Sequence, residues 1–365
     1  MTPQSYYRCW VEVDLDALRH NVAAIRRRIG KAKLMAVVKA DAYGHGLAQV
    51  AGMLMQSGVD AFAVANLTEA LALRQVGGSG WPILLFGSAL PFEIEKIVEQ
   101  NITPTISTLD EAKQFDAAAG NRRIPVHIEI DTGMGRVGFW HEEAGTAIQQ
   151  IAALPHLQIE GLYTHFPSAD ENLAETRREL ELFLKVADPA FLRHAANSAA
   201  LLNLPESHLD IVRPGLALYG IAPAEDFRPG LAFKARVAFV KTVAAGRAIS
   251  YGQTLVAPRP MKVATIAAGY ADGFARHLSN AAQVLIGGRR CPVVGRVTMD
   301  QIMVDVTGLD NVACGDEVVF IGEQNGAKIT ASEVAEWAGT IAWEVLCGIT
   351  KTARVPRLYR GASAA

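Results

Sequence analysis

A regular alternation of short apolar runs with helical segments constrains the fold more than any other feature of this sequence. The runs lie at residues 34–38, 61–65, 83–86, 102–106, 124–130, 158–163, 191–195 and 210–213. They are short and aliphatic, as buried parallel strands are, and most are separated by segments with helical spacing of apolar residues. Eight such alternations predict a closed (β/α)8 TIM barrel in preference to an open doubly wound sheet.

The pattern changes near residue 232, where short alternating runs replace the long helices. Runs typical of strands lie at 233–240, 261–268, 284–294, 302–306, 317–321 and 354–359. Gly287-Gly288 and Asn325-Gly326 predict hairpin turns, and Thr330-Ala-Ser-Glu333 predicts the start of a short helix. We therefore expect an α/β barrel domain at 14–231 and a mainly-β domain at 232–365. A strand is also predicted within residues 1–13, and it could pair with the sheet of the second domain.

The composition is that of a soluble globular protein. Hydrophobic residues make up 50% of the chain, charged residues 20%, and the net charge is -2, so no positive surplus favours nucleic acid. The four cysteines are scattered without metal-ligand spacing, and we interpret them as reduced thiols. The chain start lacks a signal-peptide pattern, and no stretch approaches the ~18 apolar residues of a membrane span. We expect a cytoplasmic protein without nucleic-acid, membrane or metal partners.

Lys39 follows the first of the barrel strands, in the segment Ala36-Val-Val-Lys-Ala-Asp-Ala-Tyr-Gly-His-Gly46. A lysine at the carboxyl end of a buried strand faces a cleft with little water. Desolvation there disfavours the charged amine, so such a lysine is either paired or reactive. The alternative is an ordinary surface lysine at a strand end.

Other polar residues occupy equivalent positions. They follow five of the predicted strands: Lys39 and Tyr43, Arg136, His165, Asn197 and Ser198, and Arg213. Since functional groups of a barrel gather where strands end and loops begin, we expect them to share one rim. The alternative is a set of capping and loop residues without a common purpose.

Gly133-Met-Gly135-Arg-Val-Gly138 matches the dinucleotide-binding pattern Gly-x-Gly-x-x-Gly. That fingerprint should open the first helix of a βαβ unit. Here it lies midway through the series of strands and is followed by Phe139-Trp140-His141, so the context argues against NAD.

The chain resembles the alanine racemases, fold-type III enzymes that use pyridoxal 5′-phosphate. The resemblance rests on motifs that occur in order along nearly the whole chain: Ala36–Gly46, Asp131-Thr-Gly-Met-Gly-Arg136, Thr164-His-Phe166, Ala196-Asn-Ser198, Arg213-Pro-Gly-Leu-Ala-Leu-Tyr219, Ser250-Tyr-Gly252, Gly269-Tyr-Ala-Asp-Gly273 and Met299-Asp-Gln301. It implies a barrel that binds the cofactor, followed by a β domain. It also implies a head-to-tail homodimer whose active sites combine the barrel of one subunit with the β domain of the other.

The resemblance implies two opposed catalytic bases. Lys39 would hold the cofactor aldehyde as a Schiff base and become a free amine when the substrate amino group displaces it. The second base, on the opposite face of Cα, would be Tyr251 of the partner subunit. Because a tyrosine hydroxyl is protonated at neutral pH, nearby positive charge must favour its phenolate, and His165 and Arg213 are the expected suppliers.

The resemblance also assigns the cofactor contacts. Arg213 would face the pyridine nitrogen and leave it unprotonated, which favours racemisation over transamination. The phosphate would be bound by the hydroxyls of Tyr43 and Ser198 and by backbone amides near Gly215 and Leu216. Two further members of the cofactor set are His165 and Asn197.

Substrate binding is expected at two places. Arg136 and the backbone amide of Met299 would bind the carboxylate of alanine. Tyr270 and Asp300 are expected to support the site.

Two positions depart from the family pattern. Glu129 stands where the family often has a carbamylated lysine that pairs with the substrate arginine, and its shorter side chain predicts that pairing with Arg136 needs a water or a local shift. Ala353 stands where some members have a tyrosine at the inner gate. The missing hydroxyl leaves open a broader-specificity racemase that accepts serine or larger amino acids.

Two other classes of pyridoxal phosphate protein share features with this sequence. A basic amino acid decarboxylase also combines a barrel with a β domain, but it is usually longer and carries a cysteine and an acidic motif that are not found here. A non-catalytic pyridoxal phosphate carrier consists of the barrel only, which the tail containing Tyr251 argues against.

Overall fold

The computed structural model describes residues 6–221, 224–349 and 353–361 and divides into two compact units. Residues 17–42 and 46–228 form the barrel unit. The described residues before 17, at 43–45 and after 228 form the second unit.

The barrel unit contains eight parallel strands. They are β2 (Lys33–Val37), β3 (Ala61–Val64), β4 (Ile83–Leu85), β5 (Thr103–Ile106), β6 (Ile124–Asp131), β8 (Leu157–Tyr163), β9 (Leu192–His194) and β10 (Ile211–Val212). Their order in the sheet is β10-β2-β3-β4-β5-β6-β8-β9, and the short β7 (Phe139–Trp140) pairs with β6. All eight predicted strands are confirmed, and so is the barrel.

The barrel is nearly closed. β9 and β10 form no continuous ladder, but Asp210 N donates to Arg193 O (3.0 Å) and Arg213 N donates to Ala196 O (2.9 Å) across the remaining seam. These two bonds lie directly before and directly after β10, so the seam is held on both sides of this strand.

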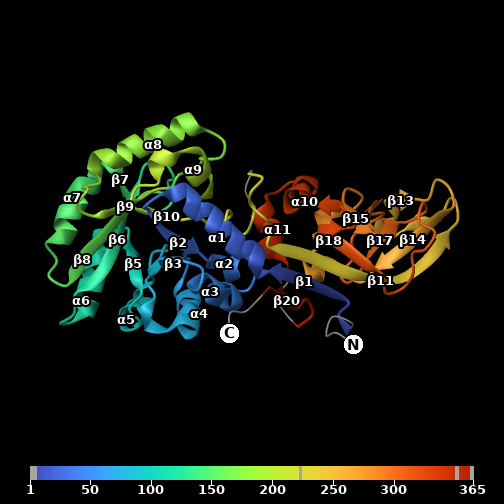
Figure 1. Ribbon diagram of the computed structural model, residues 1–365, viewed down its shortest axis with the longest axis horizontal. Coiled ribbons are helices and arrows are strands. Elements are labelled where there is room, and N and C mark those ends of the chain that lie inside the picture. Colours follow the sequence, from blue (N-terminus) through green and yellow to red (C-terminus); the bar gives the residue numbers. More distant parts are fainter. Residues whose placement is uncertain (1–5, 222–223, 350–352, 362–365) are drawn as a thin grey trace. The chain divides into compact units, whose positions relative to one another are not determined.

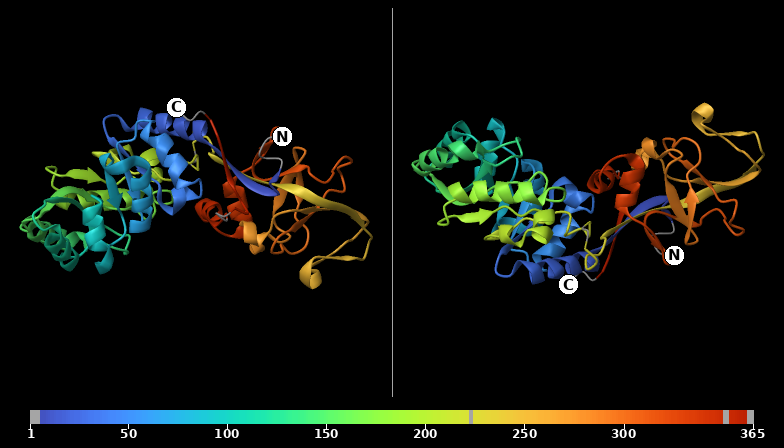
Figure 2. Two further views of the ribbon diagram at one scale, coloured as in Figure 1. Left: turned by 90° about the horizontal axis from the view of Figure 1, so that it is seen from below. Right: turned by 90° about the horizontal axis from the view of Figure 1, so that it is seen from above.

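Helices cover the outside of the strands (Figures 1 and 2). They are α1 (Leu15–Ile29), α3 (Leu47–Met55), α4 (Leu67–Gly77), α5 (Ile94–Glu99), α6 (Leu109–Ala119), α7 (His141–Ala152), α8 (Leu173–Val186) and α9 (Ser198–Asn203). Thr108 caps α6, because its side chain accepts a hydrogen bond from Glu111 N (3.1 Å).

The second unit is built on the long strand β11 (Leu231–Val243), drawn in yellow in Figure 1. Its other main strands are β1 (Cys9–Asp14), β14 (Met261–Ile266), β15 (Gln283–Ile286), β16 (Arg289–Pro292), β17 (Ile302–Asp305), β18 (Glu317–Gln324), β19 (Ala327–Ile329) and β20 (Arg357–Arg360). The short β12 (Ala248–Ile249) and β13 (Leu255–Val256) form a separate pair. β1 pairs antiparallel with β11 and parallel with β20, so both ends of the chain enter this sheet.

The predicted turns of the second unit are confirmed. Gly287-Gly288 joins β15 to β16, and Asn325-Gly326 joins β18 to β19. Thr330 caps α10 (Ala331–Ala338), which precedes a further short helix, α11 (Ala342–Gly348). The last strand begins at Arg357 rather than at the predicted residue 354, since Pro356 has no N–H for a ladder.

No helix among the described residues is long and apolar enough to cross a membrane. All four cysteines are free thiols.

Candidate active site

Lys39 lies just beyond β2 and begins an unusual turn, α2 (Lys39–Tyr43). Ala40, Asp41, Ala42 and Tyr43 have φ angles of 51°, 54°, 54° and 52°, so four consecutive residues with side chains are left-handed. Each such residue costs roughly 1–2 kcal/mol relative to a right-handed conformation. Backbone strain of this size persists only where the surroundings fix it, and it is typical of functional sites.

Two carboxylates fix this turn. The Glu69 carboxylate accepts from Ala40 N (2.7 Å) and Ala65 N (2.9 Å), which ties the turn to the end of β3. The Asp41 carboxylate accepts from Leu47 N (2.6 Å), the first residue of α3. Lys39 is therefore placed by a turn that neighbouring elements hold in a strained conformation.

We expect Glu69→Ala to release this turn. The left-handed residues should relax once Ala40 N loses its acceptor, and Lys39 should lose its fixed position. Activity should fall roughly 10–100-fold with a smaller loss of stability, measured as kcat and as the melting temperature. Glu99→Ala, at an exposed glutamate of α5, is the control; equal effects of both substitutions would contradict this assignment.

Arg213 follows β10 and is fully enclosed by the barrel, with 3% of its surface exposed. Its Nη1 donates to His194 Nδ1 (2.8 Å), and its Nη2 donates to the carbonyls of Thr164 (2.7 Å) and Ala195 (3.1 Å). The ring of Tyr163 lies beside the guanidinium, with its centroid 5.1 Å away. Burial lowers the pKa of Arg213 to about 10, so the side chain stays charged at neutral pH.

Sequence analysis did not single out His194, His127 or Tyr163, which the structure brings together beside Arg213. His194 stacks on Tyr163 with ring centroids 4.8 Å apart, and its Nε2 hydrogen-bonds His127 Nδ1 (2.7 Å). Tyr163 donates to Glu129 Oε2 (2.7 Å) and also bonds Thr105 (3.0 Å). The available signal was a polar side chain at an inward-facing position of a barrel strand, where apolar residues normally dominate.

His165 follows β8 and lies among the cations of the site. Burial lowers its pKa to about 3, and the charges of Arg213, Arg136 and Lys39 add to this effect. The imidazole is therefore neutral at neutral pH. The charges of Arg213, Arg136 and Lys39 disfavour a further charge on His165, so of the two expected suppliers of positive charge Arg213 is the one that keeps its charge at neutral pH.

This shift predicts a pH dependence of stability. The pKa of His165 is about 6.5 in the unfolded chain and about 3 in the folded one, so the unfolded chain binds more protons between these values. The contribution of neutral His165 is complete above pH 6.5 and is lost as the pH falls towards 3.

We expect the unfolding free energy of His165→Gln to fall less than that of the parent protein between pH 6.5 and 4, by on the order of 2 kcal/mol after solvent screening. Chemical denaturation across this pH range measures the difference. For His277→Gln, at a surface histidine, the curve of unfolding free energy against pH should run parallel to that of the parent. A parallel curve for His165→Gln would refute the lowered pKa of His165.

Arg136 is carried by the loop after β6. The Asp131 carboxylate shapes this loop by accepting from Gly133 N (2.9 Å) and Gly135 N (2.8 Å). Arg136 is exposed and lies more than 4.0 Å from any carboxylate of the described residues, Glu129 included. Burial raises the pKa of Glu129, while the bond from Tyr163 and the charge of Arg136 oppose the rise. Glu129 thus acts on Arg136 at a distance and not by a direct ion pair.

The side-chain oxygen of Ser198, the first residue of α9, holds the backbone of the segment that follows Arg213. It accepts from Gly215 N (3.0 Å) and Ala217 N (3.1 Å), so its own hydrogen remains to be donated. Leu216 N, between these two amides, makes no hydrogen bond within the described parts of the chain. Asn197 caps α9 by accepting from Ala200 N (3.0 Å) and donates to Phe166 O (3.2 Å). The barrel unit therefore presents Ser198 Oγ and Leu216 N as donors for an anion.

The second unit carries the other predicted residues. Tyr251 lies on a short turn with 71% of its surface exposed, and Ser250 anchors this turn by donating to Arg296 O (2.6 Å). Tyr43 also belongs to this unit by its contacts.

Tyr270, Met299 and Asp300 occupy two segments of the second unit that contact each other. Tyr270 N donates to Thr298 O (3.0 Å), and Ala271 N donates to Met299 O (3.0 Å). Asp300 accepts a hydrogen bond from Arg354, the residue after Ala353. Met299 N has no hydrogen-bond partner among the residues that the structure describes.

Family comparisons agree with this arrangement. A family model described as "Alanine racemase, N-terminal domain" matches residues 13–223, and one described as "Alanine racemase, C-terminal domain" matches residues 231–359. The chain belongs to the alanine racemase family. Both halves match in order, so the family covers nearly the whole chain.

Individual relatives lead to the same family. The chain is 44% identical to an alanine racemase of Desulforamulus reducens over 96% of this chain and 99% of the relative. Among solved structures, the alanine racemase of Clostridium difficile 630 has a TM-score of 0.89 at 36% identity and covers 97% of this chain and 96% of its own. The biosynthetic alanine racemase of Pseudomonas aeruginosa has a TM-score of 0.90 at 35% identity, covering 97% of this chain and 100% of its own.

Proposed function

We propose that this protein interconverts L-alanine and D-alanine with pyridoxal 5′-phosphate and two opposed bases. The observation that carries the proposal is the set of three cations, Lys39, Arg136 and Arg213, whose charges all act on His165 at one rim of the barrel. Such a set suits a ligand with a phosphate and a substrate with a carboxylate.

The residues present fit the cofactor. Ser198 Oγ and Leu216 N are available donors for its phosphate, with Tyr43 as the further hydroxyl of the site. Lys39 supplies the amine that its aldehyde requires. The charged Arg213, which already donates three hydrogen bonds, would be the partner of its ring nitrogen. When bound, pyridoxal 5′-phosphate withdraws electrons from Cα of the amino acid and makes the Cα hydrogen acidic.

Lys39 and Tyr251 are the proposed bases. Racemisation requires one group to remove the hydrogen from one face of Cα and another to deliver a proton to the opposite face. Lys39 would serve one face with its amine, and Tyr251 of the partner subunit would serve the other with its phenol oxygen. The high exposure of Tyr251 in the single chain suits a residue that completes its site in a homodimer.

Arg136 of one subunit and Met299 N in the β domain of the partner subunit are proposed to bind the substrate carboxylate. Arg136 has no carboxylate of its own chain within 4.0 Å in the described parts, and Met299 N has no acceptor there. A substrate carboxylate would satisfy both donors and fix the orientation of Cα.

Glu129 tunes Arg136 through its charge, which predicts the outcome of Glu129→Gln. Glutamine keeps the volume and can still accept from Tyr163, so only the charge is lost. We expect KM for alanine to rise about 3–10-fold, with a smaller change in kcat. Tyr163→Phe is the matched control because it removes the bond to Glu129 but keeps the carboxylate; a parent-like KM and kcat in Glu129→Gln would sink this role.

The broader-specificity racemase remains the second candidate, and Ala353 favours it. A small side chain next to Arg354, which binds Asp300, leaves room where a tyrosine would restrict the entrance. Serine and larger L-amino acids, tested by loss of optical rotation, distinguish the two candidates. In the cytoplasm, the reaction would either supply D-alanine for peptidoglycan or begin the degradation of D-alanine.

Reduction with borohydride tests the cofactor assignment. Purified yellow protein should lose its visible absorption on reduction, and the peptide that contains Lys39 should gain the mass of the reduced cofactor. Labelling of another lysine, or none, would overturn the assignment of Lys39.

A further inference from the structure

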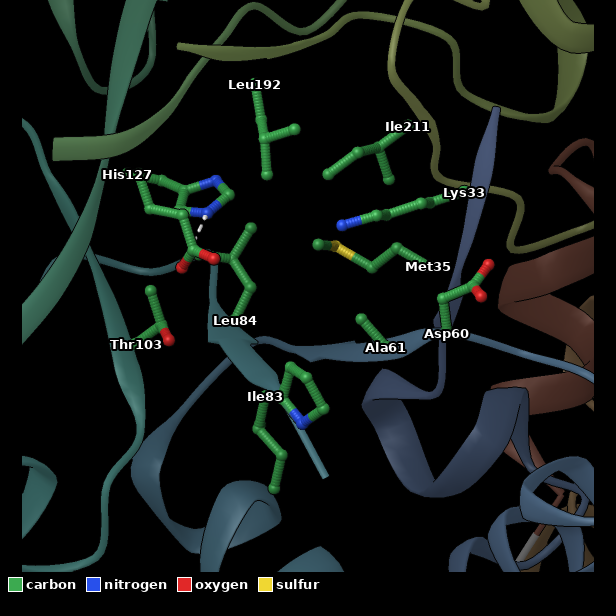
Figure 3. A pocket seen from close by; sticks show the side chains of 12 residues that line it. Lys33, Met35, Asp60, Ala61, Ile83, Leu84, Thr103, His127, Leu192 and Ile211 are labelled. Atoms are coloured by element: carbon green, nitrogen blue, oxygen red, sulfur yellow. Dashed lines mark ion pairs between the residues drawn. The ribbon is translucent and has the colours of Figure 1, made fainter. Parts of the chain in front are cut away.

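A cavity of about 280 Å³ opens at the amino-terminal mouth of the barrel, the end opposite to the loop that carries Lys39. The first residues of several strands line it, including Lys33 of β2, Ala61 of β3, Ile83 of β4 and Thr103 of β5 (Figure 3). The volume equals roughly nine water molecules of the liquid. A molecule the size of an amino acid fits it.

Opposite charges face each other across this cavity without pairing. The Lys33 ammonium points into it (Figure 3) and has no carboxylate within 4.0 Å among the described residues. On the opposite wall, Glu160 Oε2 lies 3.8 Å from His127 Nε2. The neighbouring His127 lowers the pKa of Glu160, and the charge of Lys33 lowers it further, so Lys33 acts across the gap.

The third charged residue of the wall is already satisfied. The Asp60 carboxylate accepts from Arg26 Nη2 (2.5 Å) and from Leu34 N (2.6 Å). One cation and one anion therefore remain for a ligand. Between them the wall is apolar, formed by the side chains of Met35, Leu84, Leu192 and Ile211.

His127 connects this wall to the catalytic end. Arg213 can only donate, so His194 Nδ1 accepts and neutral His194 carries its hydrogen on Nε2. His194 then donates to His127 Nδ1, which leaves the hydrogen of His127 on Nε2, towards Glu160. Arg213, His194 and His127 thus form a hydrogen-bonded relay in which each donor points towards the cavity.

The absence of a side chain at Gly161 makes room for the His127 ring of this relay. A Cβ there would lie 2.6 Å from the His127 ring, so any larger residue would displace the imidazole. His127 and His194 are 3% and 0% exposed, so water is excluded from the hydrogen-bonded relay between Arg213 and the cavity.

We propose that this cavity binds an aliphatic α-amino acid as its zwitterion, and that the bound molecule acts on Arg213 through His127 and His194. The ligand carboxylate would pair with Lys33, its ammonium with Glu160, and its side chain would contact the apolar wall. The ligand ammonium would draw Glu160 away from His127 Nε2. This would weaken the polarisation of the hydrogen bonds that link His127, His194 and Arg213.

Calorimetric titration of the holoenzyme with L-leucine tests the binding site. Lys33→Met and Glu160→Gln should each weaken binding at this site by at least about tenfold, because each leaves one ligand charge without its partner. Lys31→Met, at an exposed lysine two residues away, is the matched control and should bind like the parent. Equal affinity in the parent and both site variants, or no binding at all, overturns the proposal.

Two analogues test the ligand class. 4-Methylpentanoate lacks the ammonium and isopentylamine lacks the carboxylate, and each should bind at least about tenfold more weakly than L-leucine. Binding of the acid as tight as that of L-leucine would show a simple anion site and contradict the zwitterion.

The effect on Arg213 rests on the proposed racemase function and is measured separately. Saturating L-leucine should change kcat for alanine at least about twofold in the parent and leave it unchanged in Lys33→Met. An unchanged kcat in the parent overturns the coupling. Because binding is measured by heat, absence of racemase activity would leave the test of the site intact.

Discussion

Lys39→Ala should lower alanine racemisation at least about 10⁴-fold in both directions. The substitution removes the amine that holds the cofactor and, in the same atom, one of the two proposed bases. Both losses act on the chemical step, so kcat should fall while the melting temperature stays within a few degrees. A chiral assay of D-alanine formed from L-alanine measures the rate.

Lys31→Ala is the control for this substitution, since Lys31 lies on the surface before the same strand. Its activity should equal that of the parent protein. A Lys39→Ala variant that retained more than about one hundredth of the parent rate would show that another residue carries the cofactor.

Tyr251→Phe should lower racemisation about 10³-fold, because phenylalanine keeps the ring but cannot carry a proton. The equilibrium constant of a racemisation is one, so kcat/KM must fall by the same factor in both directions. Rates alone therefore do not reveal which face of Cα lost its base.

Hydrogen exchange in D₂O does reveal it. In Tyr251→Phe, Lys39 should still exchange the Cα hydrogen of one enantiomer without inverting it, while the other enantiomer stays unlabelled. Tyr6→Phe, at a surface tyrosine, should label both enantiomers as the parent does. Labelling of both enantiomers by Tyr251→Phe would contradict the role of Tyr251.

A mixture of the two inactive chains tests the shared active site. In a hybrid of Lys39→Ala and Tyr251→Phe subunits, one site would contain both intact residues if Tyr251 serves the partner subunit. Activity should then appear on mixing and reassociation. A mixture as inactive as its components would place Lys39 and Tyr251 of the same chain in one site.

The fold was largely predictable because its signals are local. Each barrel strand is a short aliphatic run, and helix caps such as Thr108 and turns such as Gly287-Gly288 depend on neighbouring residues only. The seam between β9 and β10 was not predictable in this way, since it consists of single hydrogen bonds such as that from Asp210 N, just before β10, to Arg193 O in β9.

The sequence placed Lys39, Arg136, His165, Ser198 and Arg213 at strand ends, and the structure has them there. What it could not give is how the strands are staggered. The stacking of His194 on Tyr163, and the bond from Tyr163 to Glu129, join three strands and depend on barrel register.

The left-handed turn after Lys39 was hidden for a different reason. Alanine and tyrosine have no preference for positive φ, and the tolerance of Asp41 for it does not predict a run of four left-handed residues. The turn is held from outside by Glu69, which accepts from Ala40 N, and Asp41 within the turn accepts from Leu47 N. Contacts of this kind with other segments cannot be predicted from residues 40–43 alone.

Incubation of the purified holoenzyme with L-alanine in D₂O tests whether the protein racemises alanine. We expect equal final amounts of L- and D-alanine, both carrying deuterium at Cα, and neither pyruvate nor ethylamine. L-alanine that stays unlabelled and optically pure, or that yields a transamination or decarboxylation product instead, would contradict this expectation.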